Sequence, residues 1–108
     1  MKLSVHYSKI AIRDLDRVFS EVYEASQSLD LSKKNIDELL DKVEKKADFP
    51  KSGFPLYYEN SFAGYYYLIY KAYMVFYRVE ENSILVDRVL FGKSDYIRRL
   101  QLMSAPLE

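Results

Sequence analysis

The sequence predicts an α+β fold in which a helical hairpin covers one face of an antiparallel sheet. Two observations lead to this prediction. The first half of the 108-residue chain carries two stretches whose apolar residues recur at helical spacing. From about residue 65 the period changes to two, and aromatic and β-branched residues dominate three short segments. The connections are short, which favours elements that run antiparallel to their neighbours.

The N-terminal half begins with a short strand over residues 2–7, where apolar and polar side chains alternate. Ser8 is a suitable N-cap for a first helix that runs to about Ser28. The segment "SLDLS" interrupts the helical pattern, and Ser32 is expected to cap a second helix. The apolar stripes of the two helices consist of Leu15, Val18, Phe19, Val22 and Ala25, and of Ile36, Leu39, Leu40, Val43 and Ala47.

The second half opens with an irregular segment, "DFPKSGFPLYYENSFAG", which holds two of the three prolines and two of the three glycines. We expect a short extended piece in it, around residues 56–59. Residues 65–70, 73–79 and 84–91 then predict a three-stranded antiparallel meander. A final helical turn or two is expected over residues 94–103, capped by Ser94.

Composition predicts one soluble, cytoplasmic domain over residues 1–106, with Leu107 and Glu108 as a possible cloning scar. The chain has no cysteine, which excludes disulfides and thiol nucleophiles. No apolar run reaches the roughly 18 residues of a membrane span. Sixteen basic and sixteen acidic residues cancel, so no overall field attracts nucleic acid. Locally, residues 88–103 hold four basic side chains against Asp95.

Most familiar catalytic patterns are missing from the sequence, which has no glycine-rich phosphate loop, no metal-ligand spacing and a single histidine, His6. The candidate functional residues are cations and a tyrosine near the meander: Lys71, Arg78, Arg88, Lys93, Tyr96, Arg98 and Arg99. Such a set suits metal-independent RNA cleavage, because arginine grips phosphate and tyrosine stacks on a base or carries a proton. The structural alternative is that Arg88 pairs with the adjacent Asp87 and that Arg98 and Arg99 end a helix.

Eleven tyrosines are the other unusual feature of the composition. A tyrosine offers a rigid contact surface with a polar tip, which suits a binding face. It equally suits a half-buried position in a sheet that packs on helices, and both interpretations stay open.

The order of elements and several local motifs resemble the RelE/ParE superfamily of type II toxin–antitoxin toxins, which includes plasmid stabilisation toxins. The similarity spans nearly the whole chain, from "SKIAIRDLDRVF" to "AYMVFYRVEENSILVDRVLFGKSDYIRRL". Its most specific parts are the strand "FYRV", residues 76–79, and "RVLFGKSDY", residues 88–96.

This resemblance implies a small α+β toxin that arrests growth and a cognate antitoxin that binds it in a hetero-oligomer. RelE-like members are mRNA interferases that cut messenger RNA on the ribosome, whereas ParE-like members poison DNA gyrase. Carried over onto this chain, the catalytic positions are Arg88, Lys93 and Tyr96. The positions that would bind RNA or another target are Lys71, Arg78, Arg98 and Arg99. No cofactor and no metal is expected.

Several positions depart from the RNA-cleaving pattern. Met74 and Ser94 stand where that branch usually has arginine, and Phe91 stands where histidine is frequent. The segment "YYYLIY" offers tyrosines where lysines are usual. Three functions therefore compete: ribosome-dependent mRNA cleavage, gyrase inhibition without catalysis, and a member that has lost toxicity and only binds its antitoxin. The breadth of the RNA-cleaving branch favours translation as the target.

Overall fold

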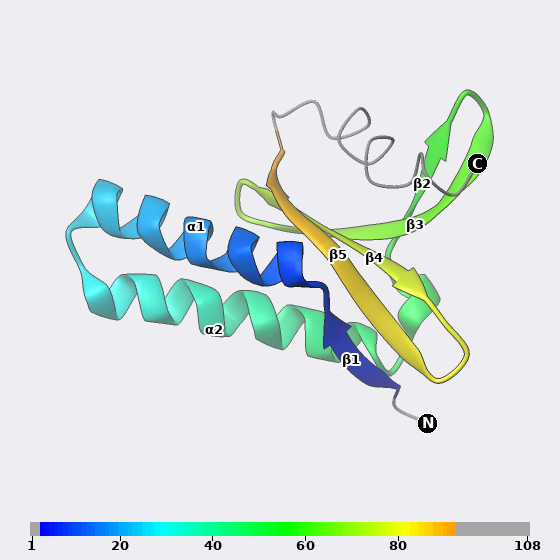
Figure 1. Cartoon of the computed structure of the whole chain (residues 1–108), viewed down its shortest axis with the longest axis horizontal. Coiled ribbons are helices and arrows are strands. Elements are labelled where there is room, and N and C mark those ends of the chain that lie inside the picture. Colours follow the sequence, from blue (N-terminus) through cyan, green and yellow to red (C-terminus); the bar gives the residue numbers. More distant parts are fainter. Residues whose placement is uncertain (1–2, 93–108) are drawn as a thin grey trace.

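The computed structural model describes residues 3–92. Its elements are β1 (Ser4–Tyr7), α1 (Lys9–Ser26), α2 (Leu29–Lys46), the 3₁₀ turn η1 (Pro50–Ser52), β2 (Phe54–Tyr58), β3 (Ser61–Tyr70), β4 (Tyr73–Val79) and β5 (Ser83–Phe91). The predicted α+β class is confirmed: the two helices form an antiparallel hairpin that lies against the sheet (Figure 1). The helix expected over residues 94–103 lies outside the described residues.

The sheet is larger than the expected three-stranded meander. It has five strands in the order β1-β5-β4-β3-β2. Strands β2 to β5 form an antiparallel meander, and the extended piece expected near residue 56 is its outer strand. Strand β1 joins the other side of the sheet by pairing parallel to β5, so the sheet is mixed.

A serine caps the start of each α-helix. At α1 the predicted cap is confirmed, because the Ser8 hydroxyl accepts a hydrogen bond from the Ala11 amide at 2.9 Å. At α2 the predicted cap Ser32 is wrong. Ser28 caps this helix by accepting from the Leu31 amide at 3.0 Å. Ser32 is buried in the second turn, where its hydroxyl donates to the Ser28 carbonyl.

The main hydrophobic core lies between the helix hairpin and one face of the sheet. Ala11, Val18, Leu39 and Val43 of the helices pack there against alternate strand residues, which are Leu68, Tyr70, Val75, Tyr77, Ile84, Val86 and Val89. A second, smaller cluster occupies the opposite face and consists of Leu56, Tyr65, Phe76 and Leu90. Both faces of the central strands are therefore buried, which explains the density of apolar residues in β4 and β5.

Three tyrosines connect the sheet to the elements packed on it. The Tyr70 hydroxyl donates to Glu38 of α2 at 2.7 Å, and the Tyr73 hydroxyl donates to Glu21 of α1 at 2.7 Å. Burial and the neighbouring carboxylate raise the pKa of each phenol to about 12. The Tyr77 hydroxyl donates to the Pro50 carbonyl. For these three, the structural interpretation of the tyrosine-rich composition holds.

Candidate functional site

The candidate site is centred on Arg88 in β5, which forms a bidentate ion pair with Asp14 of α1. The Arg88 Nε lies 2.8 Å from Asp14 Oδ2, and its Nη2 lies 3.1 Å from Oδ1. The side chains of Arg88 and Asp14 are 13% and 3% exposed. The sequence suggested Asp87 as the ion-pair partner of Arg88. The partner is instead Asp14, which precedes Arg88 by 74 residues.

Asp14 gathers two more donors. Its Oδ1 accepts from Arg17 Nη1 at 2.8 Å, and its Oδ2 accepts from the Val89 amide at 2.9 Å. Arg17 also donates to the Val89 carbonyl at 2.8 Å. We call Asp14, Arg17 and Arg88 the Asp14 cluster. Each oxygen of the buried carboxylate is thus matched with donors, which is the condition for keeping a charge in a protein interior.

Where β1 ends, hydrogen bonds from the Asp14 cluster replace strand pairing along the edge of β5. Strand β1 pairs with β5 only as far as Tyr7 and Val86, where the chain turns into α1. Beyond that point Ser8 donates from its hydroxyl to the Asp87 carbonyl, and Asp14 and Arg17 satisfy the amide and carbonyl of Val89. Side chains of a helix therefore fill the hydrogen-bonding positions that a neighbouring strand would otherwise fill.

The pKa of Asp14 lies below its usual value. Burial acts to raise it, but the hydrogen bonds from Arg88, the Val89 amide and Arg17 outweigh that effect. The carboxylate is consequently ionised at neutral pH, and Arg88 faces a fixed negative charge.

Asp87 is the buried partner of a second ion pair on the sheet, with Arg78. It is the extra residue where the pairing of β4 and β5 shifts, between Phe76–Arg88 and Tyr77–Val86. Arg78 of β4 donates from Nε to Asp87 at 2.7 Å, and its guanidinium also lies 5.9 Å from the centre of the Tyr65 ring. Burial raises the pKa of Asp87, and the charge and hydrogen bond of Arg78 only partly offset this rise.

Of the remaining sequence candidates within residues 3–92, Arg78 lies near Arg88 on the sheet and Lys71 does not. Lys71 is exposed in the turn between β3 and β4, with its ammonium 5.6 Å from the Tyr70 ring centre. Arg78 is two residues along β4 from Phe76, the register partner of Arg88, which is about 7 Å at about 3.3 Å per residue, and it pairs with Asp87. Lys93, Tyr96, Arg98 and Arg99 lie outside the described residues, as does Ser94.

Two of the positions that depart from the RNA-cleaving pattern, Phe91 and Met74, carry apolar side chains. Phe91 is 41% exposed and packs edge-on against Tyr73 at 6.0 Å. Met74 is half-buried in β4 beside the smaller core cluster. His6 is exposed on β1, paired with Leu85. Within residues 3–92, no group of three acidic, histidine or cysteine side chains can hold a metal ion, and no helix is long and apolar enough to cross a membrane.

Sequence reasoning selected Arg88 but missed Asp14 and Arg17 as its neighbours. A signal for Asp14 was present, because it lies between Ala11 and Val18 on the buried stripe of α1. A carboxylate on an apolar stripe must find donors when the helix packs. Arg17 gave no comparable signal, since a basic residue on a helix usually faces solvent.

In the described site, the positive charges of the arginine candidates are therefore neutralised by carboxylates. Arg88 and Arg78 are the two arginine candidates within residues 3–92, and each is held by a buried carboxylate. A phosphate group approaching either arginine would meet the negative charge of Asp14 or Asp87.

Comparison with known proteins identifies relatives of this fold. A family profile described as the ParE toxin of the type II toxin–antitoxin system parDE matches residues 5–96. A comparison with curated protein sequences found no match. Among solved structures, the chromosomal ParDE toxin–antitoxin system from P. aeruginosa is similar with a TM-score of 0.70 and 17% identity, covering 85% of this chain and 98% of that one. The RelBE2 toxin–antitoxin complex from Mycobacterium tuberculosis is similar with a TM-score of 0.61 and 17% identity, covering 84% and 92%.

Proposed function

The chain belongs to the ParE family of type II toxin–antitoxin toxins, within the RelE/ParE superfamily, and from this premise we propose that it arrests growth by binding a protein target rather than by cutting messenger RNA. For a toxin that acts by binding, the target implied by the resemblance to ParE-like members is DNA gyrase. This differs from the inhibition of translation that the sequence favoured, and the reason is the surroundings of Arg88.

The observation that carries the proposal is the Asp14 cluster. RNA cleavage without a metal needs cations that are free to neutralise the charge developing on the phosphorane. Arg88 is instead bound to an ionised carboxylate that is 3% exposed. Withdrawing Arg88 toward a phosphate would leave Asp14 with less compensation, and breaking a buried pair costs about 3–5 kcal/mol.

The other described positions support the same proposal. Arg78 forms an ion pair with Asp87. Met74 and Phe91 contribute no charge where the RNA-cleaving branch carries arginine and histidine. An apolar and aromatic surface of this kind suits contact with a protein, since aromatic side chains and methionine are enriched in protein interfaces.

We further propose that the partner is a cognate antitoxin that forms a hetero-oligomer with the toxin. The two similar solved structures are toxin–antitoxin systems, which supports this partner. Co-expression with the product of an adjacent small gene should relieve growth arrest and yield a complex that co-purifies. A chain that arrests growth equally with and without that product would contradict the partner.

Two assays on one toxin preparation test the mechanism. We expect the toxin to inhibit supercoiling by purified gyrase and to leave messenger RNA intact in a translation extract. Discrete cuts in the RNA together with normal supercoiling would overturn the proposal in favour of the RNA-cleaving alternative.

A double variant tests whether gyrase inhibition depends on the charges of Asp14 and Arg88. Asp14→Asn/Arg88→Gln removes both charges together and keeps hydrogen-bonding groups at both positions, so it leaves no uncompensated buried charge. Provided that circular dichroism shows a folded protein, we expect it to inhibit gyrase within about threefold of the wild type, which corresponds to less than about 1 kcal/mol.

A further inference from the structure

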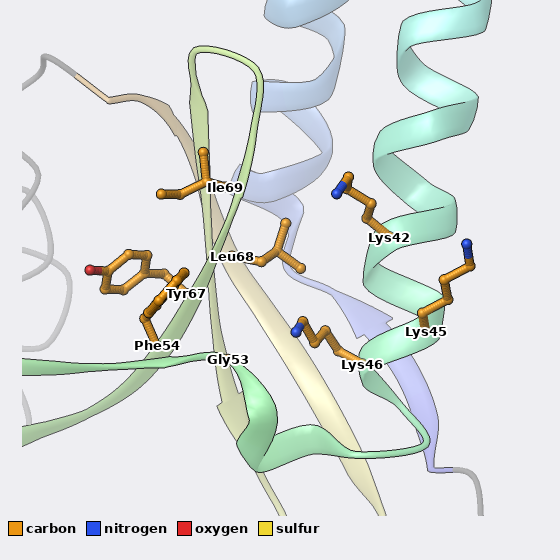
Figure 2. Close-up of a pocket in the computed structure, with 8 residues that line it drawn as sticks. All are labelled: Lys42, Lys45, Lys46, Gly53, Phe54, Tyr67, Leu68 and Ile69. Atoms are coloured by element: carbon orange, nitrogen blue, oxygen red, sulfur yellow. The ribbon is translucent and has the colours of Figure 1, made fainter.

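A pocket of about 310 Å³ lies between the C-terminal half of α2 and the end of β3, and we call it the α2–β3 pocket (Figure 2). Three lysines of α2 line one side of it: Lys42, Lys45 and Lys46. The other lining residues come from β3 and from the start of β2 with its preceding glycine, and none of the described lining residues is acidic. Small-molecule sites commonly measure about 300–1,000 Å³, so this pocket suits a small ligand.

The three lysines retain capacity for an anion. Lys45 pairs with Asp41 at 3.2 Å, but both side chains are more than 60% exposed, and such surface pairs are weak. Lys46 donates to the neutral Ser52 hydroxyl at 3.2 Å. No carboxylate in the described part of the chain forms an ion pair with Lys42. The pocket therefore carries positive charge that the described residues leave largely uncompensated.

The dipole of α2 explains only part of this charge. Cations are favoured in the last turn of a helix, beside its unpaired carbonyl groups. Lys45 and Lys46 lie in that turn, but Lys42 lies one turn earlier. Figure 2 shows Lys42 and Lys46 extending toward β3. Residues four apart on a helix have Cβ atoms about 5–6 Å apart, so the two ammonium groups can bind one short chain of phosphates.

The sheet edge at the pocket presents unused backbone groups. Strand β2 pairs with β3 only as far as Phe54 and Tyr67, and no described strand continues beside residues 68–70. The Tyr67 carbonyl oxygen lies 3.0 Å from the position that a side chain on Gly53 would take, so it faces the side of β2. Backbone groups alternate along a strand, so the amide and carbonyl of Ile69 face the same side. This donor and acceptor complement the edge of a nucleobase.

An apolar surface adjoins these backbone groups. Figure 2 shows Tyr67 and Ile69 pointing away from the lysines, with Phe54 beside Tyr67. The rings of Phe54 and Tyr67 have centres 5.3 Å apart. Phe54 and Ile69 are 56% and 50% exposed. An exposed aromatic ring next to a hydrogen-bonding edge suits a flat heterocycle, because every nucleobase has a face that stacks on such a ring.

We propose that the α2–β3 pocket binds a nucleoside triphosphate. Lys42 and Lys46 would hold the phosphate chain as point charges. The base would lie at the open edge of β3, with hydrogen bonds to the Ile69 backbone and one face against Phe54. The lysines alone fit any oligophosphate, whereas the aromatic ring and the backbone edge add recognition of the base. This inference goes beyond the proposed function and does not depend on it.

Titration of the whole toxin with ATP in buffer containing magnesium is the direct test. Backbone amide chemical shifts, followed by nuclear magnetic resonance, report binding even at millimolar affinity. We expect saturable shifts at residues 42–46 and 67–70 that weaken as salt is raised. Inorganic triphosphate should bind at least about fivefold more weakly than ATP and should shift only the α2 residues. Equal affinity for the two ligands would overturn recognition of the base.

Substitution of the lysines supplies a matched pair of variants. Lys42→Gln/Lys46→Gln should weaken ATP binding by about tenfold or more, because the phosphate chain loses both charges. Lys33→Gln/Lys34→Gln makes the same charge change on exposed residues nearer the start of α2 and should leave binding unchanged. Circular dichroism checks that both variants are folded. Equal losses in the two variants would overturn the proposed site.

Phe54→Ala separates the base from the phosphates. We expect it to weaken ATP binding by about fivefold or more and to leave triphosphate binding unchanged, because only the base contacts the ring. Parallel losses for both ligands would contradict stacking on Phe54.

Two further outcomes would overturn the proposal. One is the absence of shifts at residues 42–46 and 67–70 with millimolar ATP, which would leave the lysines as solvated charges. The other is tighter binding of an oligothymidylate than of ATP at those residues, which would assign the pocket to a nucleic-acid strand. Binding is measured on the toxin alone, without gyrase, so the pocket and the proposed function can fail separately.

Discussion

At the scale of single residues, Asp14 decides what Arg88 can do. An arginine near the end of a strand is chemically suited to grip phosphate, and the sequence could show no more than that. The carboxylate that holds it comes from a helix 74 residues earlier in the chain. Spacing along the sequence cannot identify such a pair. The position of Asp14 on the apolar stripe of its helix does predict that a hydrogen-bond donor must reach it.

Replacing Asp14 tests this pair. Asp14→Asn should lower the free energy of unfolding by about 3 kcal/mol, near the lower end of the range for breaking a buried ion pair, because the amide oxygen can still accept from Val89. Urea denaturation measures the change. Asp16→Asn, at an exposed position in the same helix, should change it by less than about 0.5 kcal/mol. Similar values for the two variants would show that Arg88 does not depend on Asp14.

The same pair predicts a dependence on pH. Because the pKa of Asp14 is lowered in the folded state, its stabilising contribution is fully present above the unfolded pKa, about 3.9. The contribution falls as pH drops below that value toward the folded pKa. The stability difference between wild type and Asp14→Asn should therefore be constant near neutrality and shrink in acid. A difference that grows in acid would have the wrong sign.

At the scale of elements, the sequence predicted every helix and most strands of the described chain, but it misplaced the start of α2. Leu29 and Leu31 lie in the first turn and are 55% and 39% exposed. The first turn therefore shows no apolar stripe, and the regular pattern begins only near Ile36. Both serines of "SLDLS" are acceptable caps by residue type, so only the packing of Ser32 against the core distinguishes them.

The cap of α2 gives a direct test at this scale. Ser28→Ala should destabilise the protein by about 1 kcal/mol, because the Leu31 amide loses its acceptor. Thermal and urea unfolding measure the loss. Ser20→Ala, at an exposed position within α1, serves as the control and should have little effect. If Ser28→Ala were as silent as Ser20→Ala, the helix would not begin as described.

The parallel pairing of β1 with β5 also could not be predicted from the sequence. A four-residue strand gives no indication of which neighbour it will join. The pairing matters because it ends at Tyr7, where α1 begins, and so brings Asp14 alongside Val89. The site geometry is thus a consequence of topology, whereas the meander of β3 to β5 followed from period and turn length.

At the scale of the whole molecule, the zero net charge of the chain and the pairing of Arg78 and Arg88 with carboxylates favour the proposal of a protein target over RNA. The described surface offers exposed aromatic and aliphatic side chains on β2 and β3 instead, including Phe54, Tyr57, Phe62 and Ile69. Surfaces of this type serve contacts between proteins. The fold and family could be predicted from the sequence, but the choice between targets depends on which carboxylates the folded chain brings to its arginines.

The measurement that tests this account most directly is tightly induced expression in a bacterial host, with thymidine and amino-acid incorporation followed separately over the first minutes. A toxin that binds a replication protein should depress thymidine incorporation first, while messenger RNA stays intact. A first fall in amino-acid incorporation, accompanied by cleaved messenger RNA, would contradict the account and return Arg88 to a catalytic role.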